Sequence, residues 1–211
     1  MSATRPEPPS HVMRVLGPRD PLPVEPVRRI AVAGAPGAGK TTLARMLCGR
    51  MGLPFVEFES FYHAPGWTVR PTWREDVLAF LEEPAWAIEW QGEDVREAMT
   101  ARTQVLVWLD HPRAYVVART AFRTVKRRLG YGTAIAGGNV EPPLRAFFTD
   151  PGHIVRESWH RHPVMRARVR RVIAENRHRS LVIVRLRGQR QVDAWLRGPF
   201  TDSLAGGANP G

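Results

Sequence analysis

The chain has 211 residues, of which 43% are hydrophobic and 24% charged, and its formal net charge is +11. This length suits one α/β domain and is too short for two. The sequence contains no apolar run of membrane-spanning length, no apolar signal-peptide core near Met1, and only one cysteine, Cys48. An intrachain disulfide is thus excluded, and we expect a cytoplasmic protein with no membrane partner.

The positive charge is concentrated in the second half of the chain. Residues 96–197 carry 21 basic and 7 acidic side chains, a net charge of +14, whereas residues 1–95 have a net charge of −2. Such a basic half indicates either a nucleic-acid partner or a site for a polyphosphate. Because 29 of the 31 basic residues are arginine, a skew that GC-rich codon usage also produces, the charge favours neither partner.

The first predicted elements lead to a glycine-rich loop. Residues 1–27 are rich in proline and lack periodicity, which predicts a flexible leader. The apolar run at 30–33 then predicts a buried parallel strand. Residues 34–41 read GAPGAGKT and match the phosphate-binding pattern G-x-x-x-x-G-K-[ST] at every fixed position. Apolar residues at helical spacing predict a helix over 42–51, so strand, loop and helix follow in the order that phosphate binding requires.

The loop pattern predicts a site for a nucleoside triphosphate, with ATP the leading candidate, together with Mg²⁺. Glycines allow the backbone to approach a phosphate, and backbone N–H groups at a helix N-terminus attract the anion. Lys40 would place its ammonium on the β- and γ-phosphates, and Thr41 would offer its hydroxyl to Mg²⁺. The predicted nucleotide-binding residues are Gly34, Pro36, Gly37, Ala38, Gly39, Lys40, Thr41 and Thr42.

Strands and helices alternate along the rest of the chain, which predicts an α/β fold of the P-loop NTPase type. We expect a three-layer sandwich with a five-stranded parallel sheet, helices on both faces and a basic helical lid. Further strands are predicted at 53–59, 86–90, 104–109 and 181–186, and further helices at 71–83, 93–102, 112–129, 151–176 and 189–196. The predicted domain spans 28–197, with the lid at about 113–150 and a flexible tail at 198–211.

Acidic residues at strand ends are candidates for the metal and acceptor sites. Asp110 closes the apolar strand at 104–109, a position that predicts a contact with Mg²⁺ beside Thr41, although aspartate also suits a simple turn. Glu59 is predicted to end the strand at 53–59, where it could orient an acceptor hydroxyl. Glu89 occupies a comparable position near the end of the strand at 86–90.

Three arginines on the long basic helix are candidate catalytic residues. Arg119, Arg123 and Arg127 fall at i, i+4 and i+8, so they share one helix face. We predict that this face closes over the triphosphate and stabilises charge on the transferred group. The alternative is a solvated basic face. Three tryptophans, Trp67, Trp73 and Trp90, either wall an aromatic acceptor or pack under a loop.

Four motifs in this order resemble a known group of proteins: the phosphate loop, Glu59–Trp67, Leu109–Arg113 and Gly138–Glu141. Over residues 28–197 the chain resembles the adenylate-kinase-related P-loop proteins often named DNA topology modulation proteins. The resemblance implies a fold similar to nucleotide and shikimate kinases, an acceptor-binding region and a mobile basic lid. This chain departs from the group at Glu59, where aspartate is usual, and at residues 89–92, where many members show Asp-Gly-Asn-Tyr.

The leading functional hypothesis is a small ATP-dependent kinase that phosphorylates a small acceptor such as a nucleotide or nucleoside. Its catalytic residues would be Lys40, Glu59 and the three arginines on the basic helix, and its metal residues Thr41 and Asp110. Two alternatives remain open: an ATP-binding regulatory or nucleic-acid-associated protein, and an NTPase that uses water as its acceptor. We expect a monomer or a homodimer.

Overall fold

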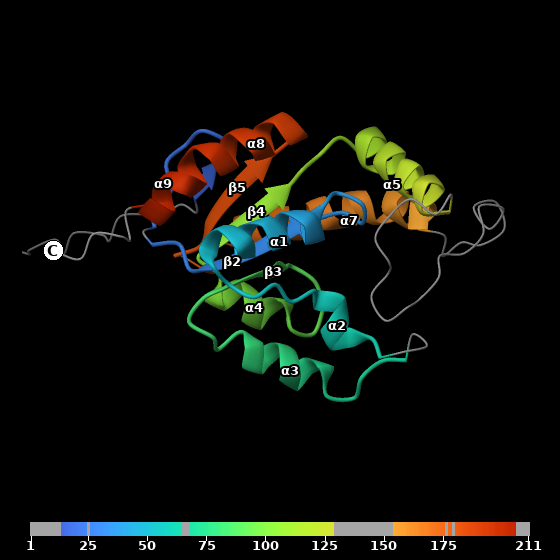
Figure 1. The fold of residues 1–211 in the computed structure, drawn as a ribbon, viewed down its shortest axis with the longest axis horizontal. Coiled ribbons are helices and arrows are strands. Elements are labelled where there is room, and N and C mark those ends of the chain that lie inside the picture. The colour runs from blue at the N-terminus through green and yellow to red at the C-terminus, as the bar shows by residue number, and fades with distance from the viewer. Residues whose placement is uncertain are drawn as a thin grey trace, which may run out of the picture.

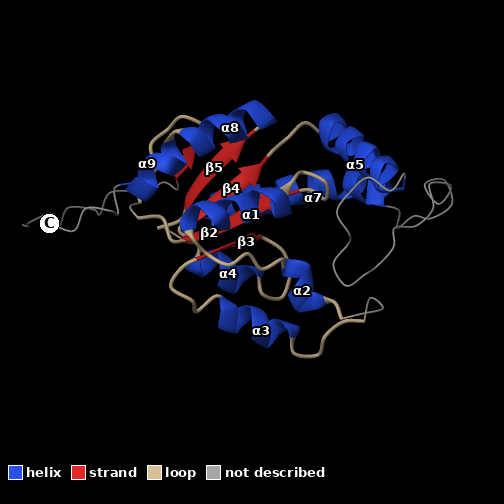
Figure 2. Ribbon diagram, viewed as in Figure 1, coloured by secondary structure: helices blue, strands red, loops and turns tan. Residues whose placement is uncertain are grey.

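A computed structural model describes residues 14–24, 26–64, 68–128, 154–175, 177–178 and 180–205, with the side chains of 127–128 and 154–156 excepted. Within these residues, five strands form one fully parallel sheet in the order β1-β5-β4-β2-β3. Figure 2 shows this sheet between helices. The strands are β1 (Arg14–Leu16), β2 (Arg29–Gly34), β3 (Trp86–Glu89), β4 (Val105–Leu109) and β5 (Val182–Leu186).

Helices connect the strands and cover both faces of the sheet (Figure 1). Their bounds are α1 (Lys40–Met51), α2 (Phe58–Tyr62), α3 (Trp73–Phe80), α4 (Arg96–Arg102), α5 (Arg113–Arg128), α7 (Ile154–Glu175), α8 (Gln189–Arg197) and α9 (Pro199–Ala205). Buried residues of α1, α8 and α9 pack against one face, and those of α3, α4 and α7 against the other. The predicted three-layer α/β sandwich is confirmed.

Alternation along the strands explains the two cores. In β2, Ile30 and Val32 point to the α1 face, whereas Ala31 and Ala33 point to the α7 face. Every residue of β3 and β4 is buried, as expected for strands of a parallel sheet that is covered on both sides. This sheet holds the carboxyl ends of β2, β3 and β4 next to one another.

Three sequence predictions are wrong in detail. The leader is not structureless, because residues 14–16 form β1 and supply the fifth strand beside β5. Residues 53–59 form no strand: residues 53–57 pair with no strand of the described sheet, although β3 is its edge strand, and α2 begins at Phe58. The tail is not loose throughout, because α9 buries Phe200 against Trp195, with 5.1 Å between ring centroids.

The two long helices of the basic half are confirmed. α5 matches the helix predicted over 112–129, and α7 matches the one predicted over 151–176. These helices pack against each other beside the end of β2. The part of the predicted lid at 129–150 lies outside the described residues, as does the motif at 138–141.

Candidate nucleotide-binding site

The glycine-rich loop joins the carboxyl end of β2 to the first turn of α1. Gly37 and Gly39 have φ angles of +83° and +101°, a region that side chains with a Cβ rarely adopt. The Ala38 N–H donates to the Ala35 carbonyl at 3.0 Å, which closes the turn, and α1 begins at Lys40. The N–H groups of a helix start therefore lie next to the loop, as an anion site requires.

The loop is also tightly packed, so a Cβ at two of its glycines would lie very close to neighbouring atoms. A Cβ on Gly37 would lie 1.8 Å from Thr120 Oγ1 of α5. A Cβ on Gly34 would lie 3.0 Å from the Ala38 Cβ and 3.2 Å from the Leu109 Cβ. The phosphate-loop pattern thus marks both a backbone conformation and a close approach of α5.

Lys40 lies at the centre of the candidate site. Its Nζ donates to the Ala35 carbonyl at 3.4 Å. Burial lowers the pKa of Lys40, and the positive charge of Arg123 lowers it further, whereas the carboxylates of Glu89 and Glu59 raise it. The ammonium is therefore desolvated with acids and an arginine around it, an arrangement in which an added phosphate would be strongly attracted.

Helices α5 and α7 both contact the loop. Arg119 Nη1 lies 3.5 Å from the Ala38 carbonyl, and the guanidinium faces Gly39. Ser158 of α7 is buried and donates its hydroxyl to the Pro36 carbonyl at 2.8 Å. The structure thus brings Arg119 and Arg123 to the loop, and the side chain of Arg127 is not among those described. Sequence analysis missed Ser158, which has no local signal.

Asp110 lies at the end of β4 as predicted, but its carboxylate is held by two arginines. Arg166 Nε of α7 lies 2.8 Å from Oδ1, and Arg185 Nε of β5 donates to Oδ2 at 2.8 Å. The Asp110 side chain is only 1% exposed. Both oxygens thus face arginines, although Oδ1 forms no hydrogen bond among the described residues. The contact of Asp110 with Mg²⁺ stays a prediction.

Glu89 is a second acid at a strand end, and it has a carboxylate oxygen that a ligand would satisfy. It ends β3, pairs in register with Val32, and is fully buried. Its Oε2 accepts from the Phe58 N–H at 3.0 Å, and its Oε1 has no hydrogen-bond partner among the described residues. A buried carboxylate oxygen without a partner is costly unless a ligand satisfies it. Sequence analysis noted this position without assigning it a role.

Glu59 lies on α2, directly after the residue that binds Glu89. Burial raises the pKa of Glu59, although its side chain is 44% exposed. Its Oε2 lies 3.5 Å from His63 Nε2. Glu59 therefore reaches the Lys40 region from a short helix rather than from the strand end that the sequence predicted.

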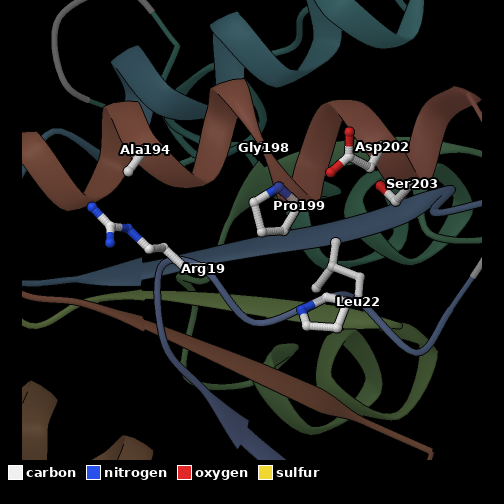
Figure 3. Close-up of a pocket in the computed structure, with 8 residues that line it drawn as sticks. Arg19, Leu22, Ala194, Gly198, Pro199, Asp202 and Ser203 are labelled. Carbon is white, nitrogen blue, oxygen red and sulfur yellow. The ribbon is translucent and has the colours of Figure 1, made fainter.

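A small cavity lies beside the loop, between α1, α5 and the start of α8. Its lining includes Gly39, Thr42, His111, Arg119 and Gln189. His111 is buried, and burial lowers its pKa, with a further contribution from Arg119. A larger cavity of about 320 Å³ lies elsewhere, between residues 19–22 and the junction of α8 and α9 (Figure 3).

The described residues show neither a ready-made metal site nor a membrane-spanning helix. They contain no group of three or more histidine, cysteine, aspartate or glutamate residues arranged to hold a metal ion. None of the helices described is both long enough and apolar enough to cross a membrane.

Comparisons with known proteins agree with this geometry. Residues 30–119 match the model of the family described as ATPase family associated with various cellular activities (AAA). This match includes the G-x-x-x-x-G-K-[ST] loop and the strands β2 (from Ile30), β3 and β4. The chain is also similar to a putative adenylate kinase of Pyrococcus abyssi, at 31% identity over 54% of this chain, and to one of Pyrococcus furiosus, at 28% over 54%. It spans 63% of the length of each relative.

A solved gluconokinase from Sinorhizobium meliloti is a third similar protein. It is 15% identical, covers 88% of this chain and 94% of its own, and superposes with a TM-score of 0.45. Both curated relatives are named as putative adenylate kinases, and the chain spans less than two thirds of their length. The narrower resemblance to DNA topology modulation proteins stays a prediction.

Proposed function

We propose that this protein is an ATP-dependent phosphotransferase that moves the γ-phosphoryl group of ATP to a hydroxyl of a small acceptor. The observation that carries the proposal is the position of Lys40. This phosphate-loop lysine has the carboxylates of Glu59 and Glu89 near it, and Arg123 of α5 acts on it as well. Phosphoryl transfer needs charge stabilisation on the phosphates and an acid that orients the acceptor, and this arrangement offers both.

The phosphates would bind along the loop. Backbone N–H groups at the start of α1 and the Lys40 ammonium would hold the β- and γ-phosphates. Arg119 and Arg123 would stabilise the charge that spreads over the transferred group. Both arginines come from α5, so a movement of α5 against the loop would bring them to the nucleotide or take them away.

Mg²⁺ would neutralise charge on the phosphates when it is bound with ATP. We propose Thr41 and Glu89 as the residues that would hold this ion. The Thr41 hydroxyl lies in the first turn of α1, and Glu89 has a buried carboxylate oxygen with no partner among the described residues. Oxygen donors of this kind are those that Mg²⁺ prefers. Asp110 would instead fix Arg166 and Arg185 against the sheet.

The nucleobase would lie toward the small cavity lined by His111, Arg119 and Gln189. An imidazole whose pKa is lowered stays neutral at pH 7 and offers one hydrogen-bond donor and one acceptor. The Arg119 guanidinium, which lies over Gly39, could stack on a base from the other side. The proposal therefore assigns the base and the acceptor to opposite sides of Lys40.

The test is ATP consumption in the presence of candidate acceptors, measured with a coupled assay. A kinase should consume ATP slowly alone and at least about tenfold faster with the right acceptor. Arg123→Ala should lower this stimulated rate about tenfold with a small effect on ATP affinity, because a transition-state contact is lost. Arg170→Ala, on an exposed position of α7, is the charge-matched control. Equal losses in both variants would contradict the role of Arg123.

An alternative outcome of the same assay is ATP hydrolysis that no acceptor stimulates. This result would favour an NTPase that uses water or a regulatory, nucleic-acid-associated protein. Salt-dependent binding of DNA, with a slope that indicates several phosphate contacts, would then support the nucleic-acid candidate.

A further inference from the structure

One segment of this basic protein is strongly acidic. Residues 53–103, which include α2, α3, β3 and α4, contain four arginines, no lysine and ten acidic residues, a net charge of −6. The remainder of the chain therefore has a net charge of +17. In Figure 1 these helices lie together on the β3 side of the molecule, whereas α5 and α8 lie on the other side of the sheet. We name residues 53–103 the acidic segment.

The acidic segment reaches the phosphate loop through Glu89 and α2. The Phe58 N–H donates to Glu89 Oε2 at 3.0 Å, which fixes the start of α2 against the end of β3. Glu59 is the next residue and, like Glu89, lies close enough to Lys40 to interact with its charge. An acceptor that receives a phosphoryl group near Lys40 would thus meet these carboxylates from the side of the acidic segment.

Three of the four arginines of the acidic segment are paired with carboxylates of the same segment. Arg70 pairs with Asp76 at 2.9 Å, Arg74 Nε donates to Asp94 at 2.6 Å, and Arg102 pairs with Glu82. Arg96 stacks on Trp90, with its guanidinium carbon 5.2 Å from the ring centroid. Besides backbone N–H groups, protein sites for phosphate groups use guanidinium or ammonium groups that are available to the anion. In the acidic segment, three guanidinium groups are therefore paired, and the Nε of the fourth, Arg96, is buried without a hydrogen-bond partner among the described residues.

In the described part of the chain, the carboxylates near Lys40 have fewer ion-pair partners than the arginines of the acidic segment. Glu157 of α7 is paired with Arg161 at 2.8 Å, and Glu59 Oε2 lies 3.5 Å from His63 Nε2. Glu89 has no ion-pair partner among the described residues, and its Oε1 is unpaired. If Glu89 is taken by Mg²⁺, Glu59 remains as the carboxylate that faces the acceptor. A carboxylate accepts hydrogen bonds from hydroxyl groups and repels anions.

We propose that the acceptor is a hydroxylated molecule that carries no phosphate or carboxylate group, such as a nucleoside, a sugar or a polyol. The inference rests on the proposed phosphotransferase function and narrows its substrate class. Glu59 accepts the hydrogen bond of the reacting hydroxyl, whose oxygen forms the new bond to the γ-phosphorus as the bond to the β,γ-bridging oxygen breaks. The products are ADP and the phosphate monoester, and the hydroxyl proton leaves through Glu59.

The test compares matched pairs of acceptors that differ only in a phosphate. The pairs are adenosine and AMP, uridine and UMP, ribose and ribose 5-phosphate, and glycerol and glycerol 3-phosphate. ATP consumption and product mass are measured with the full chain. The inference predicts that a phosphate-free acceptor stimulates turnover, and that its phosphorylated partner has a kcat/KM lower by at least about tenfold. Preference for AMP, UMP or another phosphorylated member would overturn the inference and leave the phosphotransferase function intact.

Variants of Glu59 test the residue that carries the inference. Glu59→Gln should lower kcat/KM for the best acceptor by at least about tenfold and leave the KM for ATP unchanged. Glu75→Gln, on an exposed position of α3, removes a carboxylate from the same segment and should have no effect. A Glu59→Gln variant with normal acceptor kinetics would overturn the inference. If no acceptor of either series stimulates turnover, both the inference and the phosphotransferase function fail.

Discussion

Replacement of Asp110 by asparagine distinguishes a structural carboxylate from a metal-binding one. The Asp110 side chain is 1% exposed, and its two oxygens meet Arg166 and Arg185. Asparagine keeps the volume but removes the negative charge and one acceptor oxygen. We therefore expect Asp110→Asn to destabilise the fold, while the dependence of ATP turnover on Mg²⁺ stays unchanged.

The expected size follows from the burial of the three groups. Breaking a buried ion pair costs about 3–5 kcal/mol when the remaining charge is fully buried. Here the arginine side chains are 38% and 26% exposed, so water partly compensates them, and we expect about 2–3 kcal/mol. For a chain of this size, that loss lowers the melting temperature by roughly 5–10 °C.

Urea unfolding followed by tryptophan fluorescence is a suitable assay. Arg185 lies over the Trp108 ring, 4.8 Å from its centroid, so the probe includes a residue in contact with the cluster. Asp202→Asn, at an exposed position of α9, is the matched control and should unfold like the unchanged protein. Unchanged stability of Asp110→Asn, together with a raised requirement for Mg²⁺, would refute the structural assignment and restore the metal role predicted from the sequence.

Two further predictions concern the loop and the acceptor carboxylate. Gly37→Ala should weaken ATP binding at least about tenfold in titration calorimetry, because its Cβ would meet Thr120 Oγ1 at a positive φ; normal affinity would contradict this packing. Burial raises the pKa of Glu59, so its ionisation opposes folding as pH rises through that raised pKa. Glu59→Gln should therefore be at least as stable as the unchanged protein at pH 8 in urea unfolding, and a clear loss of stability would mean that Glu59 serves the fold.

The phosphate loop was predictable because its signal is local. Gly34, Gly39 and Lys40 lie within seven residues, and the strand and helix that flank them have periodic apolar residues. β1 was not predictable, because three residues acquire their strand only by pairing with β5, more than 160 residues later. Residues 53–59 showed the opposite error: their alternation suits a strand, but residues 53–57 pair with no strand of the described sheet, and α2 begins at Phe58.

In the candidate site too, some residues have a local sequence signal and others do not. Arg119 and Arg123 were found from their helical spacing, which is a local property. The role of Asp110 depends on Arg166 and Arg185, which lie 56 and 75 residues away, and a strand-end aspartate looks the same with or without them. Glu89 stood out only once its unpartnered oxygen was visible beside the loop.

Binding of ATP with and without the Lys40 side chain tests the central claim most directly. Titration calorimetry with ATP and Mg²⁺ would compare the unchanged protein, Lys40→Ala and Lys126→Ala, which removes the only other lysine from an exposed position of α5. The account predicts that Lys40→Ala weakens binding at least about tenfold with an unchanged circular dichroism spectrum, whereas Lys126→Ala binds normally. Normal ATP affinity in Lys40→Ala would contradict the assignment of the phosphate loop.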